Sequence, residues 1–130
     1  MSQRGPDVNY IVLDLEWNQP LDQGALVTDP VCLNGEIIQL GAVKLNEQFA
    51  VVDEFCMYVQ PQYYPKLHNR IVALTGISDK TLAEKGVSFP EMYDCFMQWC
   101  GDEYTFVTWS MSDLPILIDN LIIHQMDLSG

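Results

Sequence analysis

Two carboxylates that follow an apolar run near the N-terminus are the residues best suited to chemistry. The run Tyr10 to Leu13 leads directly into Asp14, Leu15 and Glu16. Such a run predicts a buried strand, apolar on both faces, near the centre of a sheet. Because side chains alternate along a strand, Asp14 and Glu16 point the same way, with Cβ atoms roughly 6–7 Å apart.

A pair of carboxylates at the end of a strand has two interpretations. Asp14 and Glu16 can simply end the strand in solvent, or they can share a cation that relieves their mutual repulsion. Open α/β sheets place their ligands outside the carboxyl ends of their strands, which favours the cation. Asp-x-Glu by itself is a weak motif, so other residues must decide between the two.

Asp113 is the third candidate acid. The segment 110–113 has the Ser-x-x-acid pattern of a capping box, in which Asp113 serves only the start of a helix. Alternatively, the strand before it lies beside the first strand, and Asp113 joins Asp14 and Glu16 at one end of the sheet. Three such carboxylates can begin a two-metal site that cleaves phosphodiesters, with ions about 4 Å apart. The two roles are compatible.

The elements that must position these acids are read from apolar periodicity. The expected strands are Tyr10–Trp17, Glu36–Leu45, Val51–Val59 and Thr105–Ser110. Short connections favour an antiparallel meander of the first three. The fourth follows a helix and can lie parallel to the first through a right-handed crossover. A loop over residues 18–34 is expected to pass over the acidic strand end, and Gly41 predicts a bulge or a close backbone contact.

Helices are expected at 66–74, 78–86 and 90–100, followed by one that begins between Ser110 and Asp113. The apolar positions that should face the core are Leu67, Ile71 and Leu74; then Met92, Phe96, Trp99 and Cys100; then Leu114, Ile118, Leu121 and Ile122. Gly76 and Gly101 are expected to end the first and third of these helices.

Composition limits the class of protein. The 130 residues are 48% hydrophobic, which suggests one globular domain. A net charge of −12 argues against a basic face that grips nucleic acid through many phosphate contacts. It leaves open a nucleic-acid enzyme in which divalent metals meet the phosphate.

The four cysteines form no Cys-x-x-Cys pair, and the chain has two histidines, so a zinc site is not expected. Free buried thiols in a reducing cytoplasm are the favoured interpretation. The first nine residues lack the apolar segment of a signal peptide, and no apolar run is long enough to cross a bilayer. We therefore expect a cytoplasmic protein with no membrane partner.

Four segments in order resemble the DEDDh 3′–5′ exonucleases, the family of the proofreading epsilon subunit and RNase T. The segments are Leu13–Glu16, Glu36–Val43, Leu74–Ser78 and Thr108–Asp113, and together they span nearly the whole chain. The Trp-Ser-Met-Ser-Asp run is most similar to the Eri-type and KapD-type branch, which favours RNA.

The resemblance implies a ribonuclease H-like α/β fold, a mixed sheet with flanking helices, and stepwise removal of nucleotides from a free 3′ end. By that analogy two Mg²⁺ or Mn²⁺ ions act: Asp14 bridges both, Glu16 helps to hold the ion on the nucleophile side, and Asp113 holds or orders the other. The implied nucleic-acid-binding residues are Leu15, Trp17, Leu74, Thr75, Ile77 and Met111. For Trp17, packing against the core is as good an interpretation as stacking on a base.

One motif of the family is missing. The family carries a His, the general base, five residues before a further Asp on a late helix. Here His124 and Asp127 have the wrong spacing and follow Asp113 too soon. A surface histidine is therefore the favoured interpretation of His124. We expect residues 1–130 to be the N-terminal portion of the exonuclease domain, C-terminally truncated, with the fifth strand and last helix absent.

Two functional classes remain open from the sequence. The chain is either a 3′–5′ exonuclease or part of one, or an inactive exonuclease-like module that binds nucleic acid or a protein partner. The missing fifth strand would leave strand 105–110 as an exposed edge beside Phe106 and Val107. Such an edge predicts a homo-oligomer.

Overall fold

The computed structural model describes residues 9–108 and 112–125. Their elements, in chain order, are β1 (Asn9–Asn18), a 3-10 turn η1 (Gln23–Ala25), β2 (Glu36–Leu45), β3 (Val51–Tyr58), α1 (Asn69–Thr75), α2 (Asp79–Lys85), α3 (Phe89–Cys100), β4 (Tyr104–Thr108) and α4 (Asp113–Ile123). Each expected strand and helix has a counterpart here, although the end of the fourth expected strand lies outside the described residues.

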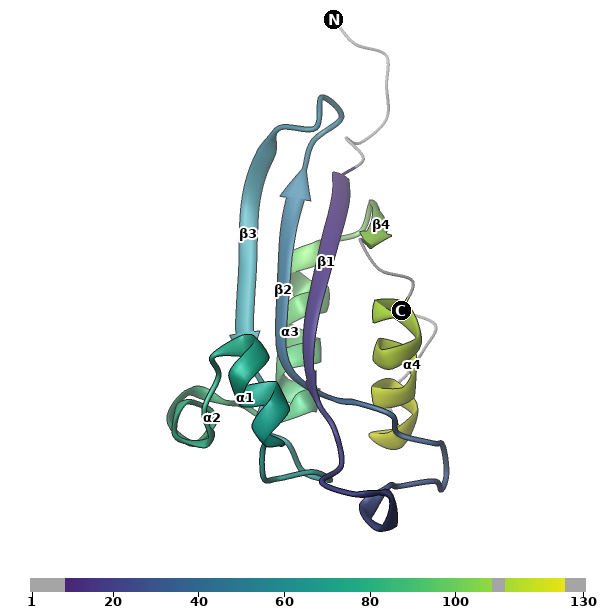
Figure 1. Ribbon diagram of the computed structural model, residues 1–130. Helices are drawn as coiled ribbons and strands as arrows, with labels where there is room; N and C mark the ends of the chain where they lie inside the picture. Colours follow the sequence, from purple (N-terminus) through teal and green to yellow (C-terminus); the bar gives the residue numbers. More distant parts are fainter. Residues whose placement is uncertain (1–8, 109–111, 126–130) are drawn as a thin grey trace, which may run out of the picture.

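The strands form one mixed sheet in the order β3-β2-β1-β4, as Figure 1 shows. β2 pairs antiparallel with both β1 and β3, which confirms the expected meander. β4 pairs parallel with β1, with Leu13 opposite Thr108, so the crossover through the helices brings the end of β4 to the acidic end of β1. This mixed sheet with flanking helices confirms the ribonuclease H-like fold class.

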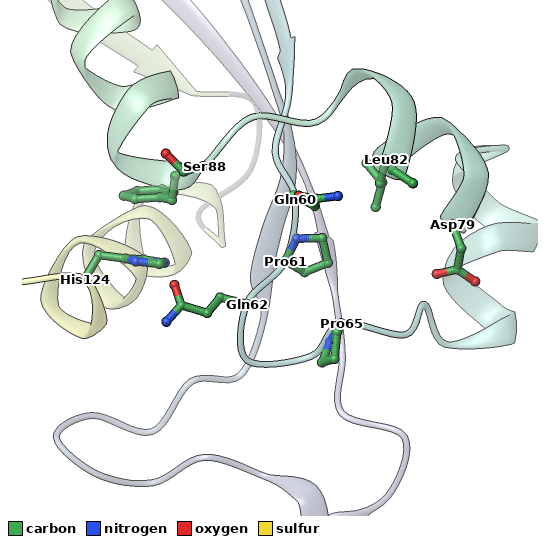
Figure 2. A pocket seen from close by; sticks show the side chains of 10 residues that line it. Gln60, Pro61, Gln62, Pro65, Asp79, Leu82, Ser88 and His124 are labelled. Atoms are coloured by element: carbon green, nitrogen blue, oxygen red, sulfur yellow. The ribbon is translucent and has the colours of Figure 1, made fainter.

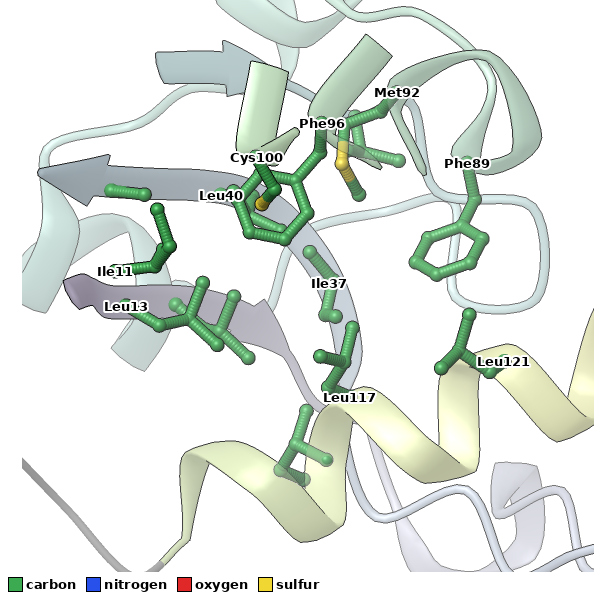
Figure 3. Close-up of a cluster of buried hydrophobic side chains, with 14 residues drawn as sticks. Ile11, Leu13, Ile37, Leu40, Phe89, Met92, Phe96, Cys100, Leu117 and Leu121 are labelled. Atoms are coloured by element: carbon green, nitrogen blue, oxygen red, sulfur yellow. The ribbon is translucent and has the colours of Figure 1, made fainter. Parts of the chain in front are cut away.

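One face of the sheet carries the main core. Ile11, Leu13 and Leu15 of β1 are buried there in one cluster with residues of α3 and α4. Figure 3 shows Ile11 and Leu13 beside residues of both helices. From α3 the residues Phe89, Met92, Phe96 and Cys100 contribute, which largely confirms the predicted stripe, and Trp99 is partly buried at its margin. α3 begins with the Ser88 hydroxyl accepting the Glu91 N–H, and it ends at Gly101, whose φ of 80° suits glycine.

The other face of β1 is not fully covered, so the expectation of a strand apolar and buried on both faces is wrong. Val12 is half-buried and Asp14 is exposed. Within the described residues, α1 and α2 form a second, smaller cluster that packs on Ile38 and Tyr58 near the carboxyl end of β1. The open area of the sheet face therefore lies next to the acids.

Two helices present different faces from those predicted. In α1, Ile71 is buried, but Leu74 is 71% exposed and lines an open cavity beside β1 instead of the core. In α4, Ile116, Leu117 and Leu121 face the core, whereas Leu114 and Ile118 are exposed. The helix is apolar around most of its circumference, so periodicity could not select the buried side.

The irregularity in β2 lies at a different place from the predicted one. Gly41 pairs regularly with Asp14, and a Cβ at Gly41 would meet the Asp14 carbonyl oxygen at an ordinary 3.6 Å. The register shift instead falls between Glu16 and Trp17, where β2 carries Ile38 as an extra residue. Bulges of this kind bend a strand and redirect its side chains, and they are common beside active sites.

The thiols also differ from expectation. Cys100 is buried, whereas Cys32, Cys56 and Cys95 are exposed, and all four are free. No helix among the described residues is both long enough and apolar enough to span a membrane.

Candidate active site

Asp14 and Glu16 lie on the same face of β1, as the alternation of the strand requires. Asp14 is exposed and Glu16 is half-buried, and they face Gly41 and Gln39 across the β1–β2 ladder. They point to the sheet face that is not covered by α3 and α4. Both carboxylates are therefore reachable by a ligand.

Asp113 is brought to these two acids by the fold. It is the first residue of α4 and only 4% exposed. Its carboxylate accepts a hydrogen bond from the backbone N–H of Leu15, the residue between Asp14 and Glu16. Because the helix starts at Asp113, this residue does not occupy the third helical position that the capping-box interpretation requires. Ser110, the other half of that box, lies outside the described residues.

The three carboxylates interact electrostatically. Burial raises the pKa of Glu16 above its ordinary value, and the negative charges of Asp14 and Asp113 raise it further. Burial and then the charge of Asp14 raise the pKa of Asp113, while the Leu15 N–H opposes that rise. Like charges held together in this way favour a proton or a cation in the site.

The donor chemistry fits a hard divalent ion, because carboxylate oxygens are the ligands that Mg²⁺ and Mn²⁺ prefer. The side chains are not, however, already gathered around one point: among the described residues, no group of three or more His, Cys, Asp or Glu is arranged to hold a metal ion. Mg²⁺ usually keeps several waters and is bound through one or two carboxylates plus substrate phosphates. The three acids are thus ligands of the type that such an ion prefers, and they lie close enough in the fold to influence one another electrostatically.

A cavity of about 180 Å³ opens beside Glu16. It is lined by Leu15, Glu16, Trp17, Gln19, Arg70, Ile71, Leu74 and Thr75. Four of the six residues implied for nucleic-acid binding therefore meet in one place, next to an acid. Ile77 does not line this cavity, since it is buried in the α1–α2 cluster. Met111 lies outside the described residues.

Trp17 packs mainly against protein. A Cβ added at Gly35 would lie 2.2 Å from the Trp17 Cδ1 atom, so the indole rests directly on the Gly35 backbone. Trp17 also packs on the main core. The packing interpretation is therefore confirmed, and stacking on a base stays a prediction for the part of the residue that lines the cavity.

His124 lies far from the acids. It follows α4, whereas Asp113 begins that helix, and eleven residues of helix separate their positions by roughly 16 Å. Its ring stacks on Phe89 with centroids 4.7 Å apart, and burial lowers its pKa. Figure 2 shows it at a different cavity, of about 470 Å³, near Gln62 and Pro61. It is a half-buried packing residue and not the surface histidine that was expected.

A model of the exonuclease family, which is named for RNase T, matches residues 11–112 of this chain. The chain belongs to this exonuclease family. The match runs from β1 to the residue before α4, so it includes Asp14 and Glu16 and ends next to Asp113. The resemblance to DEDDh exonucleases read from the sequence is thereby confirmed.

One curated protein is similar to this chain in sequence, and solved structures are similar to it in fold. The probable 3′-5′ exonuclease KapD of Bacillus subtilis is 26% identical over 119 residues, which cover 91% of this chain and 55% of KapD. The chain thus spans just over half the length of this curated relative. The nuclease domain of 3′hExo, a DEDDh family member solved with rAMP, has a TM-score of 0.71 at 22% identity, covering 92% of this chain and 60% of that one. The structure of cell-death related nuclease 4 (CRN-4) has a TM-score of 0.73 at 24% identity, and the match covers 91% of this chain and 40% of that one.

Buried polar side chains that the sequence analysis did not single out brace the elements around the candidate site. Asn18 is fully buried at the end of β1. Its amide nitrogen donates to the carbonyls of Tyr64 and Lys66, and its oxygen accepts the His68 N–H. These three bonds fix the segment that leads into α1, and α1 supplies one wall of the cavity beside Glu16.

Asn120 and Glu36 are two further buried polar residues whose side chains bond to backbone groups of distant segments. Asn120 is fully buried in α4, accepts the Ile37 N–H and donates to the Gly35 carbonyl. It thereby joins α4 to β2 next to the bulge. Glu36 accepts backbone N–H groups of residues 62–64, and burial raises its pKa against those bonds. For Asn18 and Glu36 the sequence offered a signal, a polar residue at the end or the start of an apolar strand. For Asn120 the signal was a polar residue within an apolar helix.

Proposed function

We propose that residues 1–130 form the N-terminal portion of a 3′–5′ exonuclease domain that hydrolyses terminal phosphodiesters of RNA or other single-stranded nucleic acid. The observation that carries the proposal is the hydrogen bond from the Leu15 N–H to Asp113. It ties the third acid to the backbone of Leu15, the residue between Asp14 and Glu16 in a central strand, beside a cavity that Glu16 lines.

Each part of the site has a role in this proposal. Asp14, Glu16 and Asp113 bind Mg²⁺ or Mn²⁺ together with the substrate phosphate. When bound, a pair of such ions activates water and stabilises charge on the phosphate and the leaving oxygen. Leu15, Trp17, Leu74 and Thr75 contact the terminal nucleotide. The exposed Leu74 suits this role, since an apolar side chain at a cavity mouth can pack on a sugar or base.

RNA is the favoured substrate. The Trp-Ser-Met-Ser-Asp run is similar to the Eri-type and KapD-type branch, and solved relatives include a 3′-exonuclease with 3′-end specific recognition of a histone mRNA stem-loop. An inactive binding module is the second candidate. It is favoured by one observation, namely that neither histidine lines the cavity beside Glu16.

Metal binding tests the site directly. Titration calorimetry with Mn²⁺ should give a weak isotherm for the wild type, and Asp14→Ala should weaken the affinity at least about tenfold, because even outer-shell partners of a metal contribute about 10–100-fold. The affinity should rise with pH, since Glu16 and Asp113 have raised pKa values and must lose their protons to bind.

The matched control for that titration is Asp102→Ala, which removes one exposed carboxylate from the turn before β4. It should bind Mn²⁺ like the wild type. Equal isotherms for Asp14→Ala and the wild type would contradict the metal site, as would an affinity that falls as the pH is raised from mildly acidic to neutral.

We also propose that two copies associate through β4, one of the two edge strands of the described sheet. Phe106 and Val107 are 38% and 43% exposed. An apolar groove of about 280 Å³ runs beside this edge, between α3, β4 and α4, and is lined by residues that include Phe106, Leu114 and Ile118. A second copy offers the same strand and groove, so the contact can be self-complementary.

Analytical ultracentrifugation at tens of micromolar should therefore show a dimer or larger species. Val107→Lys should shift it to monomer, because charged side chains on an edge strand oppose pairing with another chain. Glu103→Lys changes the charge just before the strand and serves as the control. A monomeric wild type would refute the association.

A further inference from the structure

Basic residues are concentrated in one part of this acidic chain. The segment 66–85 holds four of its six Lys and Arg residues, against two acids, while the whole chain carries −12. This segment contains α1 and α2 and the turn that precedes them. A local positive region on a strongly negative protein is where an anion can approach most favourably.

Arg70 is a basic residue that lies beside the acidic site. It lines the cavity that contains Glu16, and it sits one helical turn before Leu74 on α1. Its backbone N–H bonds to the His68 Nδ1 atom, but its guanidinium forms no hydrogen bond or ion pair with any described residue, Glu16 included. An exposed guanidinium that no described residue holds can take a phosphate in a two-pronged contact.

Lys66 and His68 lie just before Arg70 in the chain and line a different cavity from Glu16. Together with Leu21, Leu67 and Asn69 they line a neighbouring cavity of about 220 Å³. The His68 Nδ1 atom accepts the Arg70 N–H, so a neutral ring carries its proton on Nε2. That Nε2–H can donate to an anion without disturbing the start of α1.

We propose that Lys66, His68 and Arg70 form a phosphate-contacting strip, along which the backbone of a single-stranded nucleic acid runs toward its 3′ end at Glu16. The proposal rests on the proposed exonuclease function and adds the path of the strand. Arg70 binds the phosphate nearest the acids, and Lys66 and His68 bind phosphates further from the 3′ end.

Phosphate is the occupant that the chemistry favours. A single carboxylate ligand would need only one cationic partner. Lys66, His68 and Arg70 instead stand at every second position of the chain, which suits a ligand with several phosphates in a row. The donors also end at a cavity that is partly apolar, where a base or sugar can pack. Because contacts to phosphate carry no base information, the strip should bind strands of different sequence alike.

The test is the salt dependence of binding by the full chain. The probe is a single-stranded RNA that is labelled at its 5′ end and has a free 3′-hydroxyl. Its fluorescence anisotropy in Mg²⁺ and increasing KCl gives the slope of the logarithm of the association constant against the logarithm of the salt concentration. Arg70→Gln should make that slope shallower by about 0.7, the value for one phosphate contact on a single strand. The double variant with Lys66→Gln and Arg70→Gln should make the slope shallower by about 1.4, the value for two phosphate contacts.

Lys80→Gln is the matched control, because it removes one exposed positive charge from α2 and lines neither cavity. Its slope should equal that of the wild type. Arg70→Lys should keep the slope while losing affinity, since lysine holds the charge without the planar fork. Unchanged thermal unfolding of Arg70→Gln should show that the exposed side chain is not needed for folding.

Each result decides between the two proposals. Equal slopes for Arg70→Gln and Lys80→Gln, with the strand still bound, would overturn the strip and leave the exonuclease proposal standing. A wild type that binds no strand at all would overturn both.

Discussion

Release of mononucleotides from 3′-labelled single-stranded RNA by this chain is expected to be about 10²–10⁴-fold slower than by an exonuclease that carries its general base, because that is the typical contribution of such a base. The two histidines of the sequence are His68 and His124, and neither lines the cavity beside Glu16. His124 is stacked on Phe89 beyond the far end of α4.

Rates should be measured with Mn²⁺ for the wild type, Glu16→Gln and Asp102→Asn. Both substitutions remove one negative charge, but Glu16 lies in the site and Asp102 is exposed in a turn. Any residual release should disappear in Glu16→Gln and persist in Asp102→Asn. Release at a rate typical of complete exonucleases, lost in Glu16→Gln, would mean that one of the two histidines or a second copy supplies the base.

Replacing Asn18 by alanine is expected to lower the free energy of unfolding by about 3 kcal/mol or more, because it leaves three backbone groups without a partner and each costs about 1–3 kcal/mol when buried. Asn18 is 0% exposed, and its loss would strand the carbonyls of Tyr64 and Lys66 and the N–H of His68. A loss of this size is a large part of the stability of a small domain.

Urea unfolding followed by circular dichroism measures this change. Asn69→Ala is the control, since Asn69 is an exposed residue of α1, and substitutions at such positions usually stay within about 0.5 kcal/mol. If Asn18→Ala unfolds like Asn69→Ala, the three hydrogen bonds do not hold the approach to α1. An Asn18→Ala protein that still folds should also bind RNA more weakly, because α1 forms a wall of the cavity.

The sequence by itself determined the strands and their order of pairing. β2 runs from Glu36 to Leu45, the same bounds that the apolar pattern predicts. The meander and the parallel return of β4 also follow from local features, because short connections require antiparallel neighbours and a helical connection permits a parallel one. Asp14 and Glu16 share a face for an equally local reason, the two-residue repeat of a strand.

Tertiary structure decided what lies around those acids. Whether Asp113 serves the helix or the site depended on where α4 begins, and its bond to the Leu15 N–H joins residues almost a hundred positions apart. The buried side of α4 depended on which of its apolar faces met the sheet, a choice that an almost wholly apolar helix does not express in its periodicity. The position of Arg70 also depends on tertiary structure, because Asn18 holds the segment before α1 through its backbone groups. Every residue has such backbone groups, so the sequence of that segment does not indicate which of them Asn18 will bind.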